Sequence, residues 1–229
     1  MIVYDQTLVS HIREAIFEPA SWPDAKVVPG TAGGRGKTLL INVDQQQWAL
    51  RHYHRGGMAG RLLSDQYLWL GAQRTRSFCE WLLLERLSEM GLPVPRPVAG
   101  RFIRQGPIYT ADLITVRIPD VVPLSTRLST GSISPDVWRE IGRMIGRFHA
   151  AAIFHADLNA HNVQIDDQER CFLLDFDRGR IRAVRGTWMT QNLQRLHRSL
   201  TKISRDSAIE FSGREWNSLL AGYRTVADD

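Results

Sequence analysis

The sequence has little cysteine and no long apolar segment. Its 229 residues include only two cysteines, and neither Cys79 nor Cys171 stands in a CxxC or metal-ligand spacing. We interpret both as reduced thiols of the core in a reducing compartment. The N-terminus lacks the features of a secretory signal, and the apolar run that begins at Trp81 stops at Glu85, far short of a bilayer-spanning length. These absences favour a soluble or peripheral protein on the cytoplasmic side of a membrane.

The chain has fewer acidic than basic residues. The chain has 29 Lys and Arg against 24 Asp and Glu, a net charge of +5. A basic surplus favours an anionic partner, such as a nucleotide, a phosphorylated glycolipid, a membrane surface or nucleic acid. Nucleic acid is disfavoured because the basic residues do not alternate with aromatic ones and no reader motif is present. The chain is 43% hydrophobic, which is enough to bury a sizeable core in one or two domains.

A glycine-rich segment near the N-terminus is not a P-loop. It ends in Gly-Lys-Thr, but Thr31 stands where the phosphate-cradling motif needs glycine, and residues 39–43 are strand-like rather than helical. Glycines that lead into a strand are typical of a flexible loop whose backbone N–H groups cover nucleotide phosphates. On this interpretation Gly33, Gly34 and Gly36 contact the nucleotide. A plain glycine-rich turn is the alternative.

The most informative segment joins a catalytic loop to a strand end. It contains the pattern His-x-Asp-x-x-x-x-Asn, with Asp157 and Asn162, and Asp175 follows thirteen residues later. The intervening residues predict two short strands, 163–166 and 171–175. Phosphoryl transfer needs a carboxylate that accepts the proton of an attacking hydroxyl and oxygen ligands that hold Mg²⁺ on the phosphates. Alone, each residue could be a cap or turn former. Their order and spacing together favour a phosphotransfer centre.

A cation and a carboxylate are candidates for an ion pair beside the nucleotide. Residues 39–43 and 48–53 predict a hairpin, and Arg51 lies on its second strand. Arginine can present a planar, permanently charged fork to phosphates or to a carboxylate. The pattern of residues 75–90, with Gly91 as a stop, predicts a helix that carries Glu80 as the partner of Arg51. The alternative is that Arg51 is an ordinary exposed strand residue.

The remaining patterns predict an α+β fold with two lobes. We expect a β-rich N-terminal lobe that covers the nucleotide at residues 1–119 and a helical catalytic lobe at residues 120–229. Strands are expected at 98–103 and 108–118, and Ser134 with Pro135 marks a helix start. A further helix is predicted after Trp188.

The helix predicted after Trp188 has a basic face. Arg195, Arg198 and Lys202 share its spacing, and they are either solvated or directed at an acidic substrate or lipid headgroup. Only about ten residues separate Asp177 from Trp188 and no Ala-Pro-Glu follows, so a peptide-docking activation segment has little room. A hydroxyl of a small molecule or glycolipid is therefore the expected acceptor.

With these segments in place, the chain resembles the bacterial 3-deoxy-D-manno-octulosonic acid (Kdo) kinases, relatives of the lipopolysaccharide core heptose kinases. The catalytic loop alone resembles many kinase-like phosphotransferases, and other segments narrow the family. The matching segments are residues 50–57, 74–80, 92–97, 155–162, 174–179 and 192–200.

The resemblance implies a protein-kinase-like fold and ATP-dependent phosphorylation of the 4-hydroxyl of Kdo on a lipid A precursor, peripheral to the inner membrane. It also implies that Asp157 is the catalytic base and that Asn162 and Asp175 are Mg²⁺ ligands, while Arg51, oriented by Glu80, contacts phosphate. The sequence departs from the pattern of kinase-like folds at one position, because Arg51 stands where those folds carry lysine. Two alternatives remain open: a kinase of another acceptor, such as a core heptose or aminoglycoside, and a catalytically silent nucleotide- or lipopolysaccharide-binding scaffold.

Overall fold

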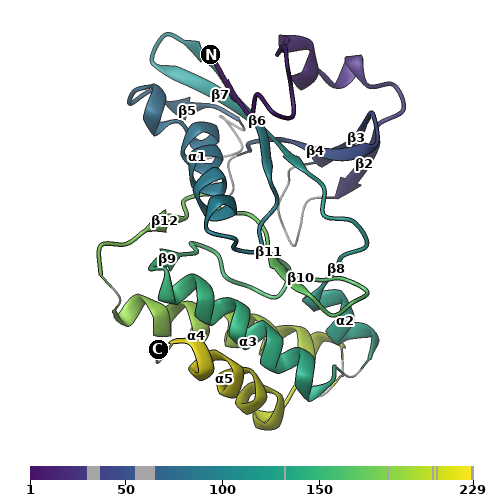
Figure 1. The fold of residues 1–229 in the computed structure, drawn as a ribbon, viewed down its shortest axis with the longest axis vertical. Coiled ribbons are helices and arrows are strands. Elements are labelled where there is room, and N and C mark those ends of the chain that lie inside the picture. The colour runs from purple at the N-terminus through teal and green to yellow at the C-terminus, as the bar shows by residue number, and fades with distance from the viewer. Residues whose placement is uncertain are drawn as a thin grey trace. The chain divides into compact units, whose positions relative to one another are not determined.

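The computed structural model describes residues 1–29, 37–54, 65–131, 133–184, 186–207, 209 and 211–227. It divides into two compact units (Figure 1). The first comprises residues 1–86 and 95–118, and the second comprises residues 87–94 and 119–229. The lobe functions assigned above to residues 1–119 and 120–229 stay predictions.

The first unit is built on an antiparallel sheet with the strand order β1-β6-β7-β4-β3-β2, and β5 pairs with β7 in addition. The predicted hairpin of β3 and β4 turns at Asp44, whose positive φ of 52° suits a tight hairpin turn. Short 3₁₀ turns follow β1 at Glu14–Phe17 and Pro19–Ser21. The strands are β1 (Ile2–Tyr4), β2 (Lys26–Pro29), β3 (Lys37–Val43), β4 (Gln46–His52), β5 (Tyr67–Leu68), β6 (Pro97–Gln105) and β7 (Ile108–Val116).

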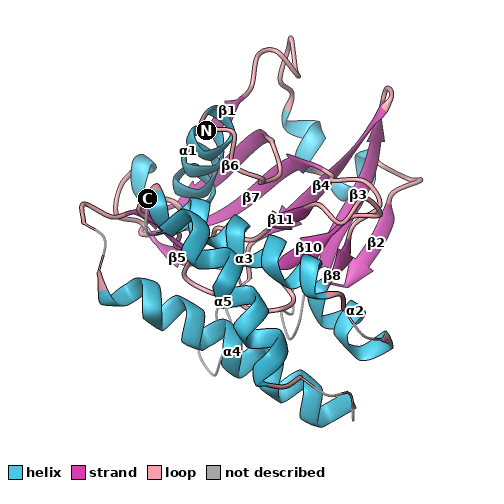
Figure 2. Cartoon of the chain, turned by 60° about the horizontal axis from the view of Figure 1, so that its bottom comes forward, coloured by secondary structure: helices cyan, strands magenta, loops and turns pink. Residues whose placement is uncertain are grey.

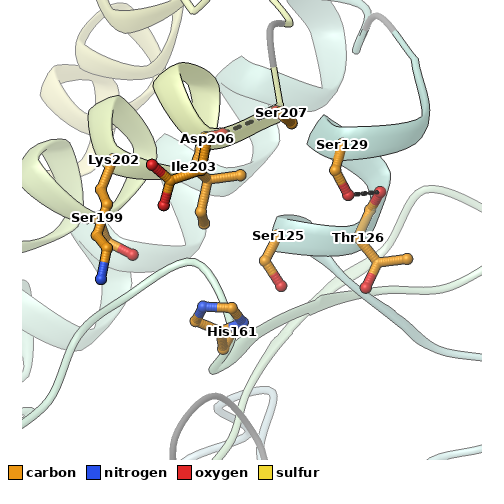
Figure 3. A pocket seen from close by; sticks show the side chains of 9 residues that line it. All are labelled: Ser125, Thr126, Ser129, His161, Ser199, Lys202, Ile203, Asp206 and Ser207. Atoms are coloured by element: carbon orange, nitrogen blue, oxygen red, sulfur yellow. Dashed lines mark hydrogen bonds between the residues drawn. The ribbon is translucent and has the colours of Figure 1, made fainter.

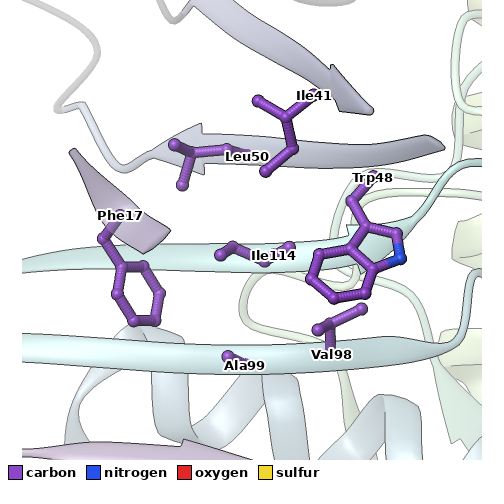
Figure 4. Packing of buried hydrophobic residues seen from close by; sticks show 7 residues of the cluster. All are labelled: Phe17, Ile41, Trp48, Leu50, Val98, Ala99 and Ile114. Atoms are coloured by element: carbon purple, nitrogen blue, oxygen red, sulfur yellow. The ribbon is translucent and has the colours of Figure 1, made fainter. Parts of the chain in front are cut away.

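The core of this sheet is formed by inward-facing residues of the central strands and by Phe17 from a 3₁₀ turn (Figure 4). Ile41 and Ile114 have no exposed surface, and Trp48 is 3% exposed. Alternate residues of a strand point to opposite faces, so a single face of β3, β4 and β7 supplies this cluster. The cluster fixes the register that places Arg51 near the end of β4.

Helix α1 (Arg76–Glu89) packs against β6, where the backbone of Gly100 lies close to Ser77 and Trp81. The hydroxyl of Ser77 also donates to the carbonyl of Arg101 at 2.9 Å. The helix ends as the sequence predicts: Gly91 adopts a φ of +65°, and the amide of Leu92 donates to the carbonyl of Leu87. These contacts fix the face of α1 that carries Glu80.

The second unit combines helices with small antiparallel sheets, one ordered β11-β10-β8 (Figure 2) and the other β12-β9 (Figure 1). Its strands are β8 (Val122–Pro123), β9 (Ile153–Phe154), β10 (Val163–Ile165), β11 (Cys171–Leu173) and β12 (Arg180–Ile181). Its helices are α2 (Leu124–Thr130), α3 (Pro135–Ala150), α4 (Thr187–Ser207) and α5 (Gly213–Ala227).

Helices α3 and α5 cross in direct backbone contact, which only glycine permits. The start of α3 matches the sequence prediction, because the Ser134 hydroxyl accepts a hydrogen bond from the Val137 amide and Pro135 occupies the first turn. A Cβ atom on Gly142 of α3 would overlap the carbonyl oxygen of Leu219, and one on Gly222 of α5 would overlap that of Arg139. Backbone atoms cannot move aside as a flexible side chain can.

Gly222→Ala is therefore expected to destabilise the protein by about 3 kcal/mol, at the upper end of ordinary overpacking costs. Urea unfolding measures the change. Gly213→Ala is the matched control, because Gly213 lies on the same helix and an added Cβ there meets no atom within 4 Å. Equal stabilities for the two variants would contradict the direct helix crossing.

The structure also corrects one sequence interpretation. Cys171 is buried, but Cys79 is exposed on α1 rather than part of the core. The helical period turns Cys79 away from the sheet, while Trp81 and Leu84 on the same helix are buried. In the part of the chain that the structure describes, none of the helices combines the length and apolar character needed to cross a membrane.

Candidate active site

Asparagine side chains hold the catalytic loop of the second unit in one shape. Asn159 Oδ1 accepts hydrogen bonds from the backbone amides of His161 at 2.8 Å and Asn162 at 3.2 Å. The carbonyl oxygen of Asp157 accepts from Nδ2 of Asn159 at 3.1 Å and from Nδ2 of Asn162 at 2.9 Å. Asp and Asn side chains often stabilise turns in this way. The result is that Asp157 and Asn162, five residues apart, are tied directly to each other.

His155 connects this loop to the strand that precedes Asp175. Its Nε2 atom lies 2.9 Å from the carbonyl oxygen of Leu174, and its Nδ1 atom accepts from the amide of Asp157 at 3.2 Å. This network assigns the proton to Nε2. Burial lowers the pKa of His155, although the hydrogen bond to Leu174 and the nearby carboxylates of Asp175 and Asp157 oppose that effect. His155 is therefore a neutral, structural residue at pH 7.

Asp175 lies at the same end of the β10–β11 hairpin as Asn162. Val163 pairs with Leu173 in the hairpin, and the amide of Leu174 donates to the carbonyl of Asn162 at 2.9 Å. Asp175 itself has a φ of +63°, a left-handed conformation that is uncommon outside glycine. Strand pairing thus brings the two predicted metal ligands to adjacent positions.

The structure reveals that α4 supports the catalytic loop through Asn192 and Ser199, which entered the sequence interpretation only as part of the family-matching segment 192–200. Asn192, 3% exposed, accepts from the amide of His155 at 3.3 Å and donates to its carbonyl at 3.0 Å. Two turns later, the hydroxyl of Ser199 accepts from the amide of Ala160 at 3.2 Å. The only local signal for this support was an asparagine at a four-residue spacing from Leu196 and Leu200, on the apolar face of the helix. Its partner, His155, lies 37 residues earlier in the sequence.

The same helix supplies a cation to the predicted base. Arg195 Nη1 lies 2.7 Å from Oδ1 of Asp157, and the side chains are 49% and 55% exposed. An exposed pair of this kind contributes little to stability. Its effect is to orient the Asp157 carboxylate while leaving it accessible to a substrate. The basic face predicted for this helix therefore includes one residue that contacts the loop.

In the first unit, Arg51 and Glu80 form the ion pair that the sequence suggested. Arg51 Nη2 lies 2.6 Å from Oε2 of Glu80, and the side chains are 26% and 3% exposed. The hydroxyl of Tyr53 also donates to Glu80, and the guanidinium of Arg51 lies 4.8 Å from the Tyr53 ring centroid. Burial and the Glu80 carboxylate raise the pKa of Tyr53 well above its ordinary value. Tyr53 therefore stays a neutral donor that helps to fix Glu80.

The glycines proposed to cover the nucleotide, Gly33, Gly34 and Gly36, lie outside the described residues. Their assignment stays a prediction.

A second buried histidine, His149, lies in the last turn of α3. His149 Nδ1 is 3.0 Å from the Tyr223 hydroxyl, and the ring is 2% exposed. Burial lowers the pKa of His149 to about 4, which a hydrogen bond with Asn192 offsets only in part. The unfolded chain binds this proton near pH 6.5, so the folded state loses stability as the pH falls from about 6.5 to about 4.

We expect His149 to remove about 3 kcal/mol of stability across this interval, because a shift of one pKa unit corresponds to about 1.4 kcal/mol. Urea unfolding at pH 7 and pH 4.5 measures the loss. His149→Gln, which has no titrating group, should show a smaller loss than the wild type. His11→Gln removes an exposed histidine and should match the wild type. If His149→Gln lost as much stability between pH 7 and pH 4.5 as the wild type, His149 would not be the group that titrates.

The comparisons with known proteins agree on a family. The sequence model of the lipopolysaccharide kinase (Kdo/WaaP) family matches residues 20–223. The chain is 41% identical over 223 residues to a 3-deoxy-D-manno-octulosonic acid kinase of Stenotrophomonas maltophilia (strain K279a), covering 97% of this chain and 88% of the relative. It is 39% identical to the enzyme of that name from Vibrio vulnificus (strain CMCP6), covering 98% and 94%.

A solved structure described as WaaP in complex with acyl carrier protein has a similar fold. Its TM-score is 0.63 at 19% identity, and the match covers 98% of this chain and 89% of that one. The α+β, protein-kinase-like fold predicted from the sequence is confirmed.

Proposed function

The chain belongs to the lipopolysaccharide kinase (Kdo/WaaP) family, and we propose that it transfers the γ-phosphoryl group of ATP to the 4-hydroxyl of a Kdo sugar on a lipid A precursor. The reaction is a step of lipopolysaccharide core synthesis. The observation that carries the proposal is the direct link between Asp157 and Asn162, whose side-chain amide donates to the Asp157 carbonyl at 2.9 Å. One rigid loop thereby presents both a candidate base and a candidate metal ligand.

Asp157 is the proposed catalytic base. Its carboxylate is 55% exposed and is oriented by Arg195. It would accept the proton of the attacking sugar hydroxyl as that oxygen bonds to the γ-phosphorus and the bond to the leaving oxygen of ADP breaks. Asn192 and His155 are positioning residues, since they hold the backbone on which Asp157 lies.

Asn162 and Asp175 fit a Mg²⁺ ion. Both offer hard oxygen donors, which Mg²⁺ prefers. Because Nδ2 of Asn162 is engaged by the Asp157 carbonyl, the amide presents its oxygen as the ligand atom. Mg²⁺ usually retains several waters and is completed by substrate phosphates, so two protein ligands are sufficient. When bound, the ion would neutralise charge on the phosphate oxygens.

Arg51 is the proposed phosphate contact of the first unit. Its ion pair with the buried Glu80 sets the direction of the guanidinium group. Arginine provides a wider fork of donors than the lysine usual at this place, and it keeps its charge at every physiological pH. This supports a functional replacement rather than the loss of a catalytic residue.

Net charge and family membership support the proposed acceptor and location. A Kdo-bearing lipid A precursor carries carboxylate and phosphate groups, which suit a chain with a net charge of +5. We propose that the protein acts as a peripheral enzyme at the cytoplasmic side of the inner membrane, whose anionic surface attracts basic residues. We do not propose nucleic acid as a partner.

Transfer of radiolabelled γ-phosphate from ATP tests the function. The acceptors are a Kdo-bearing lipid A precursor and the same precursor without Kdo, each with purified protein and Mg²⁺. We expect label on the Kdo-bearing acceptor only. Label on neither, together with measurable ATP binding, would refute this acceptor. Label on core heptose or an aminoglycoside instead would identify the enzyme as a kinase of another hydroxyl compound.

A further inference from the structure

A polar pocket lies beside the catalytic loop in the second unit (Figure 3). Its volume is about 390 Å³, enough for a sugar ring with its substituents. It is lined from three directions: by α2, by the catalytic loop just before Asn162, and by α4. The principal polar lining residues are Ser125, Thr126, Ser129, His161, Lys202 and Asp206.

One face of α4 leads from the catalytic base to this pocket. Arg195, Ser199, Lys202 and Asp206 follow one another at spacings of four, three and four residues, which places them on the same side of the helix. Arg195 contacts Asp157 and Ser199 contacts the loop. Lys202 lies seven residues beyond Arg195, about 10 Å along the axis at 1.5 Å per residue. That separation is comparable to one sugar residue with its linkages.

His161 is the residue of the catalytic loop that lines the pocket, and it directly precedes Asn162. Burial lowers the pKa of His161, and among the nearby charges Asp157 raises it while Lys202 lowers it. The ring is therefore a neutral wall of the pocket at pH 7.

Several lining groups have hydrogen-bonding capacity that the described residues do not use. Ser125 is a pocket-lining residue that is 6% exposed, and its hydroxyl makes no hydrogen bond to a described residue (Figure 3). Nor do the Lys202 ammonium and the Asp206 carboxylate form an ion pair or hydrogen bond within the described part of the chain. Lys202 and Asp206 are exposed, and Ser125 Oγ is not among the buried unpartnered atoms of the described residues, so water satisfies these groups until a ligand replaces it.

The combination of groups selects a class of ligand. Lys202 suits an anionic group, whereas Asp206 needs a ligand that donates hydrogen bonds and would repel a phosphate dianion. A sugar acid satisfies both requirements, because its carboxylate accepts and its hydroxyls donate. A neutral sugar would leave the cation without a partner, and a phosphate would leave the carboxylate without one.

We propose that this pocket binds the carboxylate-bearing sugar of the acceptor, with Lys202 paired to the sugar carboxylate and with Asp206 and Ser125 bound to ring hydroxyls. The assignment rests on the proposed function and makes Lys202 a determinant of acceptor specificity rather than of chemistry.

Steady-state kinetics of Lys202→Met test the proposal. The acceptors are the Kdo-bearing precursor and the same compound with the Kdo carboxylate converted to a carboxamide. A hydrogen bond between charged groups is worth enough to raise the acceptor KM of the variant by about 10-fold or more. Values of kcat and of the KM for ATP should stay within about twofold of the wild type, because Lys202 does not contact the reacting atoms.

Arg205→Met is the matched control, since it removes an exposed positive charge from the same helix at a residue that does not line the pocket. It should leave the acceptor KM unchanged. The wild type should bind the carboxamide acceptor about 10-fold more weakly than the acid, and Lys202→Met should no longer distinguish the two.

Three outcomes would count against the pocket. Equal acceptor KM values for Lys202→Met and Arg205→Met would overturn the pocket assignment. The proposed function would still stand if the wild type phosphorylated the Kdo-bearing acceptor. The same would follow if Lys202→Met still distinguished acid from carboxamide, because the carboxylate would then be bound elsewhere. Absence of wild-type transfer to the Kdo-bearing acceptor would remove the proposed function and the pocket assignment together.

Discussion

Asp157→Asn is expected to lower kcat by about 10³-fold, in the middle of the range for loss of a general base. The carboxamide has nearly the same size as the carboxylate but cannot accept the proton of the sugar hydroxyl. The fold should persist, because the backbone carbonyl of Asp157, not its side chain, accepts the hydrogen bonds from Asn159 and Asn162. Phosphate transfer to the Kdo-bearing acceptor measures kcat, and thermal unfolding measures stability.

Asp136→Asn serves as the control for Asp157→Asn. Asp136 is an exposed carboxylate of α3 in the same unit, and its partner is Arg139 of the same helix. The control should retain wild-type kcat and stability, since it changes the charge by the same amount away from the loop. Turnover close to wild type in Asp157→Asn would show that another group accepts the proton.

Local patterns predicted the centre of the site because its parts are close in sequence. The loop from His155 to Asn162 and the strand end at Asp175 lie within 21 residues, joined by one hairpin. Turn-forming Asn and Asp side chains and two short apolar runs are enough to define that geometry. The ion pair of Arg51 with Glu80 was predicted for a different reason, because Arg51 stands where the resembled kinase-like folds carry lysine and Glu80 lies on the helix predicted to follow.

The support of the loop could not be predicted in the same way. Asn192 and Ser199 contact residues 37 and 39 positions earlier, and nothing in the sequence of α4 specifies where the loop will lie. Local periodicity showed the apolar face of α4 and a basic face, but not that Arg195 contacts the predicted base. Helix α5 was not predicted, although its contact with α3 depends on glycines. Both features depend on tertiary packing rather than on local preference.

Asp175→Asn is expected to abolish metal-dependent nucleotide binding and to lower kcat by about 10³-fold, since charge stabilisation by a bound metal contributes several kcal/mol. Asparagine is chosen because it tolerates the left-handed conformation that Asp175 adopts at a φ of +63°. The substitution therefore removes a charged ligand without adding the backbone strain that alanine would bring.

Binding measurements separate the metal-ligand role of Asp175 from a general loss of activity. Calorimetry with ATP in the presence and absence of Mg²⁺, and electron paramagnetic resonance with Mn²⁺ and ATP, report on the metal directly. The wild type should bind ATP more tightly with Mg²⁺ than without it, whereas Asp175→Asn should show the same affinity in both conditions. Asp167→Asn is the matched control, because it removes an exposed carboxylate from the loop at the opposite end of the β10–β11 hairpin. If Asp175→Asn retained the Mg²⁺ effect, the ion would have to be bound by other residues, and strand pairing that places Asp175 beside Asn162 would serve only the turn.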